Sequence, residues 1–295
     1  MDRITRGRRV AVLSRTALYP PRSYWLCLSI VYSLCGCSDS APPPIQTLPG
    51  QVRRDAPPKD EVKDMPTADE TAEAKLRLDR AIAAHGGPVR LAKLRRQIQQ
   101  QKGTLMTGRF GLVSSDMELK LDLPDRLRFH VKAQTPEGLY PISIGFDRGQ
   151  AWMTENSVTR DVPPEVTQSL KAELNYRRLL TLMPLAEGEL PIRPIEGHPF
   201  DQKPTRGIRV LVKGGPPLDL FFDVESHLLV RTLGWFLEGG VLQLREVQFR
   251  DFQDVDGLRL PKHVVDIRDG SPWVDCTVSY TLPNTIEDSE FKRPP

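Results

Sequence analysis

Apolar side chains recur with two different periods along this chain. Between residues 71 and 85 the spacing is helical, with apolar or neutral side chains at Ala74, Leu78, Ala81, Ile82 and His85. Gly86-Gly87 ends this predicted helix, because glycine tolerates the left-handed conformation that a helix C-terminus often needs. Pro88 then favours a second short helix, since proline suits the first helical position.

A period of two follows, which is typical of half-buried β-strands. The apolar members of the first two alternating runs are Met117, Leu119, Leu121, Leu127, Phe129 and Val131. A three-residue loop of 123–125 places Leu121 opposite Leu127. A two-residue loop would place Leu121 opposite Arg128 and mix the two faces. The sequence therefore predicts an antiparallel hairpin with one apolar face.

Most of the remaining chain reads as strands and turns. Further strands are expected at 142–146, 151–154, 208–212, 218–224, 228–233, 241–249, 261–267 and 274–280. One helix interrupts them, beginning at Pro163-Pro164 and ending at Pro184. The expected fold class is α+β and mainly β, with about nine to eleven strands joined mostly in sequence as an antiparallel meander.

The first 36 residues have a different character. They hold six arginines and one acidic residue, Asp2, and an apolar run covers residues 25–34. A basic start followed by a short apolar core is typical of an export signal. The run is also shorter than the roughly 20 residues that a membrane-spanning helix needs. We therefore expect residues 1–36 to be a signal peptide.

A candidate acylation site follows this run directly. Leu34-Cys35-Gly36-Cys37 resembles the bacterial lipobox, although Ala or Ser is commoner than Cys at the second position. The resemblance implies that Cys37 is lipidated and that the signal is cleaved before it. The protein would then be a lipoprotein of the cell envelope, anchored in a membrane and facing the periplasm. Ser38 after the modified cysteine favours the outer membrane over the inner one.

Charge and composition exclude some partners. Without residues 1–36 the chain has 35 basic and 37 acidic residues, so its net charge changes from +3 to −2. A near-neutral mature chain gives no electrostatic case for nucleic-acid binding. Residues 37–70 are rich in proline and poor in apolar residues, which predicts a disordered tether. Residues 71–295 are expected to form one folded domain.

No residue pattern in the sequence indicates catalysis. The five histidines fall in different expected elements without metal-ligand spacing, so we expect surface or capping roles and no metal site. Cys276 lies on an apolar strand face, where cysteine behaves as a small hydrophobe. We expect no cofactor and no enzymatic activity. Residues 233–240 are the best candidate for an exposed apolar loop.

Four segments of the sequence carry a resemblance to a known family, and they lie at residues 83–87, 220–230, 251–261 and 284–294. Together they resemble the LolA/LolB-like superfamily of periplasmic lipoprotein carriers and their relatives. The resemblance implies a strongly curved antiparallel half-barrel, covered by helices, over residues 71–295. It also implies a hollow interior that accepts acyl chains in the carrier members.

This resemblance leads to the first functional hypothesis, a lipid acyl chain or a lipidated protein bound in an apolar cavity. Such a protein would serve lipid or lipoprotein transport. The candidate lining residues are Leu119, Leu121, Phe129, Val210, Phe222 and Val278. Two alternatives stay open, namely a periplasmic interaction or sensor module with a filled core, and an uncharacterised enzyme. The sequence leaves the oligomeric state open.

Overall fold

The computed structural model describes residues 65–238 and 241–295. The expected signal peptide, Cys37 and nearly all of the expected tether lie outside these residues. Within them, no helix is both long and apolar enough to cross a lipid bilayer.

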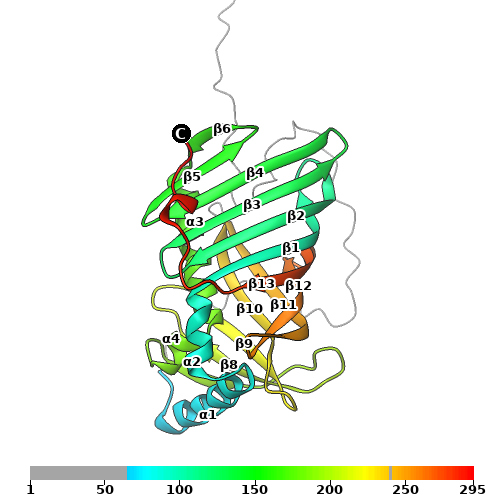
Figure 1. The fold of residues 1–295 in the computed structure, drawn as a ribbon. Coiled ribbons are helices and arrows are strands. Elements are labelled where there is room, and N and C mark those ends of the chain that lie inside the picture. The colour runs from blue at the N-terminus through cyan, green and yellow to red at the C-terminus, as the bar shows by residue number, and fades with distance from the viewer. Residues whose placement is uncertain (1–64, 239–240) are drawn as a thin grey trace, which may run out of the picture.

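Thirteen antiparallel strands form one curved sheet (Figure 1). The first six are β1 (Arg96–Thr107), β2 (Gly111–Asp122), β3 (Arg126–Thr135), β4 (Gly138–Asp147), β5 (Gln150–Glu155) and β6 (Val158–Asp161). The other seven are β7 (Ile192–Ile195), β8 (Thr205–Val210), β9 (Leu218–Asp223), β10 (Leu229–Glu238), β11 (Val241–Val255), β12 (Leu258–Arg268) and β13 (Ser271–Thr281). The helices are α1 (Ala68–Ala84), α2 (Pro88–Leu91), α3 (Pro164–Leu180) and α4 (Met183–Ala186), with 3₁₀ turns η1 (Ala92–Arg95) and η2 (Asp288–Glu290).

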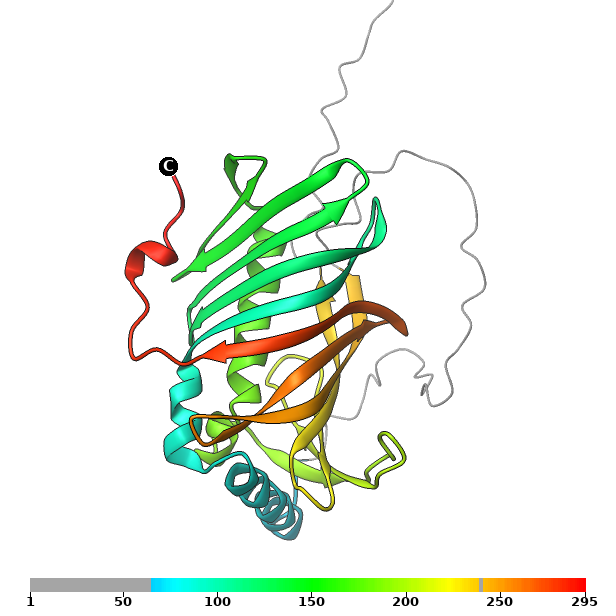
Figure 2. The same ribbon diagram turned by 45° about the vertical axis from the view of Figure 1, so that its right-hand side comes forward.

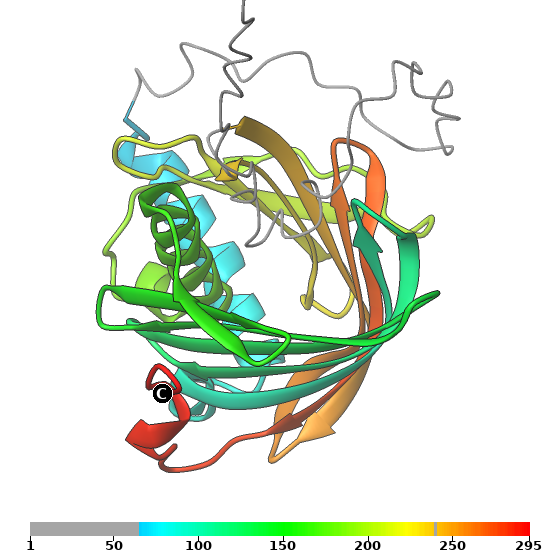
Figure 3. The same ribbon diagram turned by 90° about the horizontal axis from the view of Figure 1, so that it is seen from above.

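Two meanders meet at the middle of this sheet. Strands β1 to β6 follow one another outwards on one side, and β13 back to β7 do so on the other. The first and last strands of the chain, β1 and β13, join the two halves. The edges β6 and β7 are consecutive strands, and α3 and α4 connect them. Seen from above, the sheet curves around α3, which lies on its concave side (Figure 3).

The β2–β3 hairpin has the predicted register. Leu121 pairs with Leu127, and Asp122 pairs with Arg126 across the three-residue loop. On the opposite face Lys120 meets Arg128, a like-charge pair that the register also predicts. Glu290 of η2 relieves it, because its carboxylate accepts from Lys120 Nζ at 2.7 Å and lies 3.5 Å from Arg128 Nη1. The C-terminal segment therefore covers the convex face of this half (Figure 2).

Three strands were not predicted. The inward-facing residues of β1 are mainly glutamines, so the strand lacks an apolar period. Strands β6 and β7 have four residues each and lie at the two sheet edges, where Pro194 of β7 is tolerated. The fold class is nevertheless as expected, and the strand number is thirteen rather than nine to eleven.

Two boundaries differ from the expectation. Helix α3 ends at Leu180 instead of at Pro184, because Leu182 adopts a left-handed φ of 62° and Pro184 belongs to the separate α4. Residues 233–238 form the end of β10 rather than a loop. Leu233 is buried there, and only Leu237 near the tip is largely exposed.

Helix α1 starts and stops by local signals. Thr67 and Glu70 form a capping box, so the helix begins at Ala68. The apolar spacing had predicted a start at residue 71. Gly86 and Gly87 both have positive φ and end the helix as predicted. The helix packs on β7 and β8, and its buried side belongs to the larger of the hydrophobic clusters. A second cluster lies between α3 and strands β2 to β5.

Candidate functional site

A cavity of about 220 Å³ lies between the concave face of the sheet and α3. By comparison, about 10–15 Å³ is enough to hold one water molecule. Along β3 the lining runs from Leu127 to Thr135, which corresponds to about 26 Å at 3.3 Å per residue. The space is therefore long, and it is larger than the site of a single water molecule.

One wall of the cavity is apolar. Alternation along the strands turns every second side chain of β2, β3 and β4 inwards, and α3 adds Leu170 from the opposite side. These side chains are Leu119, Leu127, Phe129, Val131, Ile142, Ile144 and Leu170. They offer a hydrocarbon surface without hydrogen-bonding groups.

The closed end of the cavity is built around His85, the C-cap of α1. Its Nε2 accepts from the backbone N–H of Leu229 at 3.0 Å, so its Nδ1 must be the protonated nitrogen, which donates to the carbonyl of Arg259 at 2.7 Å. Burial lowers the pKa of His85, which keeps the ring neutral. His85 thus joins the end of α1 to β10 and β12.

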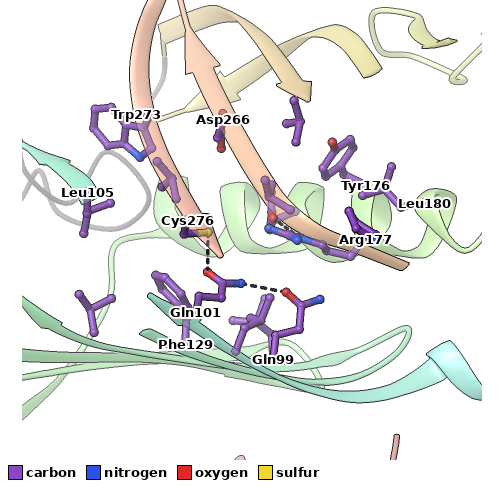
Figure 4. A pocket seen from close by; sticks show the side chains of 18 of the residues that line it. Gln99, Gln101, Leu105, Phe129, Tyr176, Arg177, Leu180, Asp266, Trp273 and Cys276 are labelled. Carbon is purple, nitrogen blue, oxygen red and sulfur yellow. Dashed lines mark hydrogen bonds and ion pairs between the residues drawn. The ribbon is translucent and has the colours of Figure 1, made fainter. Parts of the chain in front are cut away.

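A row of buried glutamines follows β1 along the cavity. Gln101 Nε2 donates to Gln99 Oε1 at 2.8 Å, and Gln99 Nε2 donates to Gln97 Oε1 at 2.7 Å. Gln97 Nε2 then donates to the carbonyl of Leu94 at 2.9 Å. Figure 4 shows Gln99, Gln101 and Cys276 beside one another. The row satisfies buried amides that would otherwise destabilise the strand.

A network of ion pairs forms the wall opposite the apolar one. Arg245 of β11 donates from Nη1 to Glu173 Oε2 of α3 at 2.6 Å and from Nε to Asp266 Oδ2 of β12 at 3.0 Å. Arg177 Nε donates to Glu173 Oε1 at 2.6 Å. Arg268 lies 3.6 Å from Asp266 and also pairs with Glu238. The three arginines and three carboxylates balance in charge, which is what burial of ions requires.

The electrostatics of this wall follow from its pairing. Burial would raise the pKa of Glu173, but the charges and hydrogen bonds of Arg245 and Arg177 lower it well below its usual value. Glu238 has less compensation, and burial raises its pKa. Burial also raises the pKa of Tyr176 to about 12.

Cys276 lies between β1 and the ion network. Burial raises the pKa of its thiol to about 12, so the nucleophilic thiolate is scarce at neutral pH. The expected role as a small buried hydrophobe fits this environment. No group of three or more His, Cys, Asp or Glu residues in the described part of the chain stands close enough to hold a metal ion.

The opposite end of the cavity reaches a rim of hairpin tips. Arg109 and Phe110 of the β1–β2 turn and Trp273 at the start of β13 line it there. The registers place the β1–β2, β3–β4, β5–β6 and β12–β13 turns at this same end, together with the paired ends of β10 and β11 at Glu238 and Val241. Large exposed hydrophobic side chains near these tips are Leu112, Leu139, Val158, Leu237, Val241 and Leu242.

The six candidate lining residues have different positions. Leu119 and Phe129 line the cavity. Leu121, Val210, Phe222 and Val278 are buried among other hydrophobic side chains and are not among its lining residues. Sequence reasoning missed the glutamine row and the ion network. The available signal was weak, because Gln97, Gln99 and Gln101 recur with a period of two but Gln100 stands between the last two of them.

The fold and site together define a curved-sheet protein with a helix-covered, amphiphilic cavity. No protein-family model matches the sequence, and no curated protein matches it significantly. Several solved structures do match. An outer membrane lipoprotein-sorting protein domain from Vibrio parahaemolyticus is 8% identical, with 75% of this chain and 97% of that chain covered, at a TM-score of 0.46.

Two further matches are of the same kind. A LolA superfamily protein from Nitrosomonas europaea is 11% identical, with 75% of this chain and 97% of that one covered, at a TM-score of 0.46. A DUF1329 family protein from Desulfovibrio piger is 13% identical, with coverages of 74% and 97% and a TM-score of 0.45. At such identities the likeness concerns the fold alone. The superfamily that the sequence phrases resemble is thus represented among the similar structures.

Proposed function

We propose that this protein is a membrane-anchored envelope lipoprotein that holds the alkyl chain of a lipid or a lipidated protein. The observation that carries the proposal is the long cavity with its hydrocarbon wall between β2–β4 and α3. Each methylene that moves from water into such a space gains about 0.8 kcal/mol. The hollow interior also favours this function over an interaction module with a filled core.

A single substitution that fills the cavity tests the proposal. Val131 lines the cavity and is buried, and its neighbour Lys132 is exposed on the other face of β3. We expect Val131→Phe to remove most lipid binding, because the larger ring occupies the space of the alkyl chain. Overpacking of this kind costs about 1–3 kcal/mol of stability, so the variant should still fold.

Native mass spectrometry of the full chain purified from membranes measures the binding. The unsubstituted protein and the matched control Lys132→Phe should both carry lipid, whereas Val131→Phe should carry little. Circular dichroism of all three checks that the sheet is intact. Absence of lipid from the unsubstituted protein, together with no mass shift after long-chain lipid is added, would exclude the proposed function.

A further inference from the structure

The two terminal guanidinium nitrogens of Arg177, Nη1 and Nη2, are unused hydrogen-bond donors in the cavity wall. Its Nε donates to Glu173. The two terminal nitrogens have no hydrogen-bond partner in residues 65–238 and 241–295, and they are not among the fully buried polar atoms. The side chain keeps 24% of its surface accessible. It points from α3 into the cavity (Figure 4), where a ligand can reach it.

The other arginines that line the cavity are engaged. Arg245 uses Nε, Nη1 and Nη2 in bonds to Glu173 and Asp266, and its guanidinium lies 4.9 Å from the ring centre of Tyr176. Arg268 pairs with Glu238 and Asp266. Arg109 at the rim pairs with Glu137. Arg177 is therefore the cationic group best placed to bind an incoming ligand.

The surroundings of Arg177 contain further donors. Arg177 of α3 lines the same cavity as Gln99 and Gln101 (Figure 4). Gln99 and Gln101 lie on β1, the strand that pairs with β13. Each amide has two N–H groups and uses one of them in the glutamine row, so one remains on each side chain.

The apolar wall begins directly beside these polar groups. Gln99 pairs with Leu119 on β2, and Leu119 pairs with Phe129 on β3, so the three side chains share the concave face. The polar end of an elongated ligand could therefore contact hydrogen-bond donors while its alkyl chain packs against the adjacent apolar wall.

We propose that Arg177, assisted by the amides of Gln99 and Gln101, binds the anionic head group of an amphiphile. The head group is a carboxylate or a phosphate, and the alkyl chain lies along Leu119 and Phe129. This proposal rests on the lipid-binding function and adds the charge of the ligand to it. The planar guanidinium suits both anions, since its two terminal nitrogens can bond two oxygens at once.

Three ligands with the same alkyl chain and different head groups test the proposal. Dodecanoate, dodecyl phosphate and uncharged dodecan-1-ol are titrated by calorimetry into the full chain carrying Cys37→Ser, which cannot be acylated at the predicted position. At about pH 8 the carboxylate is ionised. We expect one or both anions to bind about tenfold more tightly than the alcohol, as a charge-assisted pair allows. The tighter anion identifies the head group.

Substitutions at Arg177 separate recognition of charge from a structural role. Arg177→Gln should reduce the anion-to-alcohol ratio to within about twofold, and Arg177→Lys should restore most of it. Arg178→Gln is the matched control, because Arg178 is the next residue of α3, pairs with Glu189 and does not line the cavity. Its ratio should equal that of the unsubstituted protein.

The possible failures are distinguishable. If the alcohol binds as tightly as both anions, or if Arg177→Gln weakens all three ligands equally, the assignment of the head group is wrong and lipid binding stands. If none of the three ligands binds, the proposed function itself is wrong.

Discussion

Glu173 shows how single residues determine the character of the cavity wall. It is a buried carboxylate, and Arg245 and Arg177 hold it ionised at 2.6 Å each. Leaving one buried partner without the other costs about 3–5 kcal/mol. The polar wall therefore depends on complete pairing, and its arginines stay fixed in position while the cavity beside them can be occupied.

The lowered pKa of Glu173 predicts a pH dependence of stability. Its folded pKa lies below the ordinary glutamate value of 4.5, so its contribution to stability is complete above that value and is lost as the pH falls towards the folded pKa. Glu173→Gln removes the contribution. The difference in free energy of unfolding between the two proteins should be largest near neutral pH and should narrow below about pH 4.5.

Urea denaturation at a series of pH values measures this difference. Glu165→Gln serves as the control, because Glu165 lies in the first turn of the same helix and is exposed. A difference for Glu173→Gln that stays constant from neutral to acidic pH would contradict the ionised state of this carboxylate.

At the scale of elements, the junction of α1 with the β11–β12 turn fixes how the helix closes one end of the sheet. Gly86 has a φ of 115°, and a Cβ there would lie 2.4 Å from the carbonyl oxygen of Gly257. Gly87 also has a positive φ, of 85°, but a Cβ there would meet no atom within 4 Å. Both glycines therefore need a positive φ, but only at Gly86 would a side chain collide with the backbone of Gly257.

Alanine substitutions at these two glycines should differ in severity. Gly87→Ala carries only the backbone strain of its φ of 85° and ψ of 166°, a conformation that is essentially restricted to glycine and costs other residues about 1–3 kcal/mol. Gly86→Ala adds a clash with backbone and should destabilise the protein by clearly more than that. Thermal unfolding of both variants provides the comparison. Equal losses would show that the helix can move away from the turn without cost.

Sequence periodicity succeeded or failed element by element for physical reasons. The β2–β3 register was predictable because one register alone keeps Leu121 opposite Leu127 and the charges on the other face. Strand β1 was missed because Gln97, Gln99 and Gln101 take the inward positions that apolar residues usually fill. These three glutamines form the buried row that lines the cavity, so the strand that the sequence failed to predict belongs to the candidate site.

At the scale of the molecule, the curved sheet followed from the number and order of alternating segments together with the superfamily phrases. The ion network did not, because Glu173 is distant in sequence from Arg245 and meets the β11–β12 pair Arg245 and Asp266 only when α3 crosses the concave face. Contacts that depend on curvature leave no local pattern. The apolar wall was therefore partly predictable, and the charged wall was not.

Membrane attachment is a prediction about the whole molecule, and Cys37 lies outside the described residues. We expect Cys37→Ser to abolish incorporation of labelled palmitate and to release the protein from the membrane fraction, since the acyl chains supply the anchor. Cys35→Ser should change neither result, because serine is common at that lipobox position. Unchanged labelling of the Cys37→Ser protein would place the modification elsewhere or exclude it.

The pairing of β1 with β13 has a consequence for how the molecule comes into being. Residues 96–107 must wait for residues 271–281, the last strand to be made, before the two halves become one sheet. Each half can form its own hairpins earlier, since those contacts are local. When the chain emerges from a ribosome or an export channel with its N-terminus first, the cavity can therefore form only after β13 has emerged and paired with β1. Loss of the final 25 residues, which include β13, would leave two separate halves of the sheet that cannot enclose a ligand.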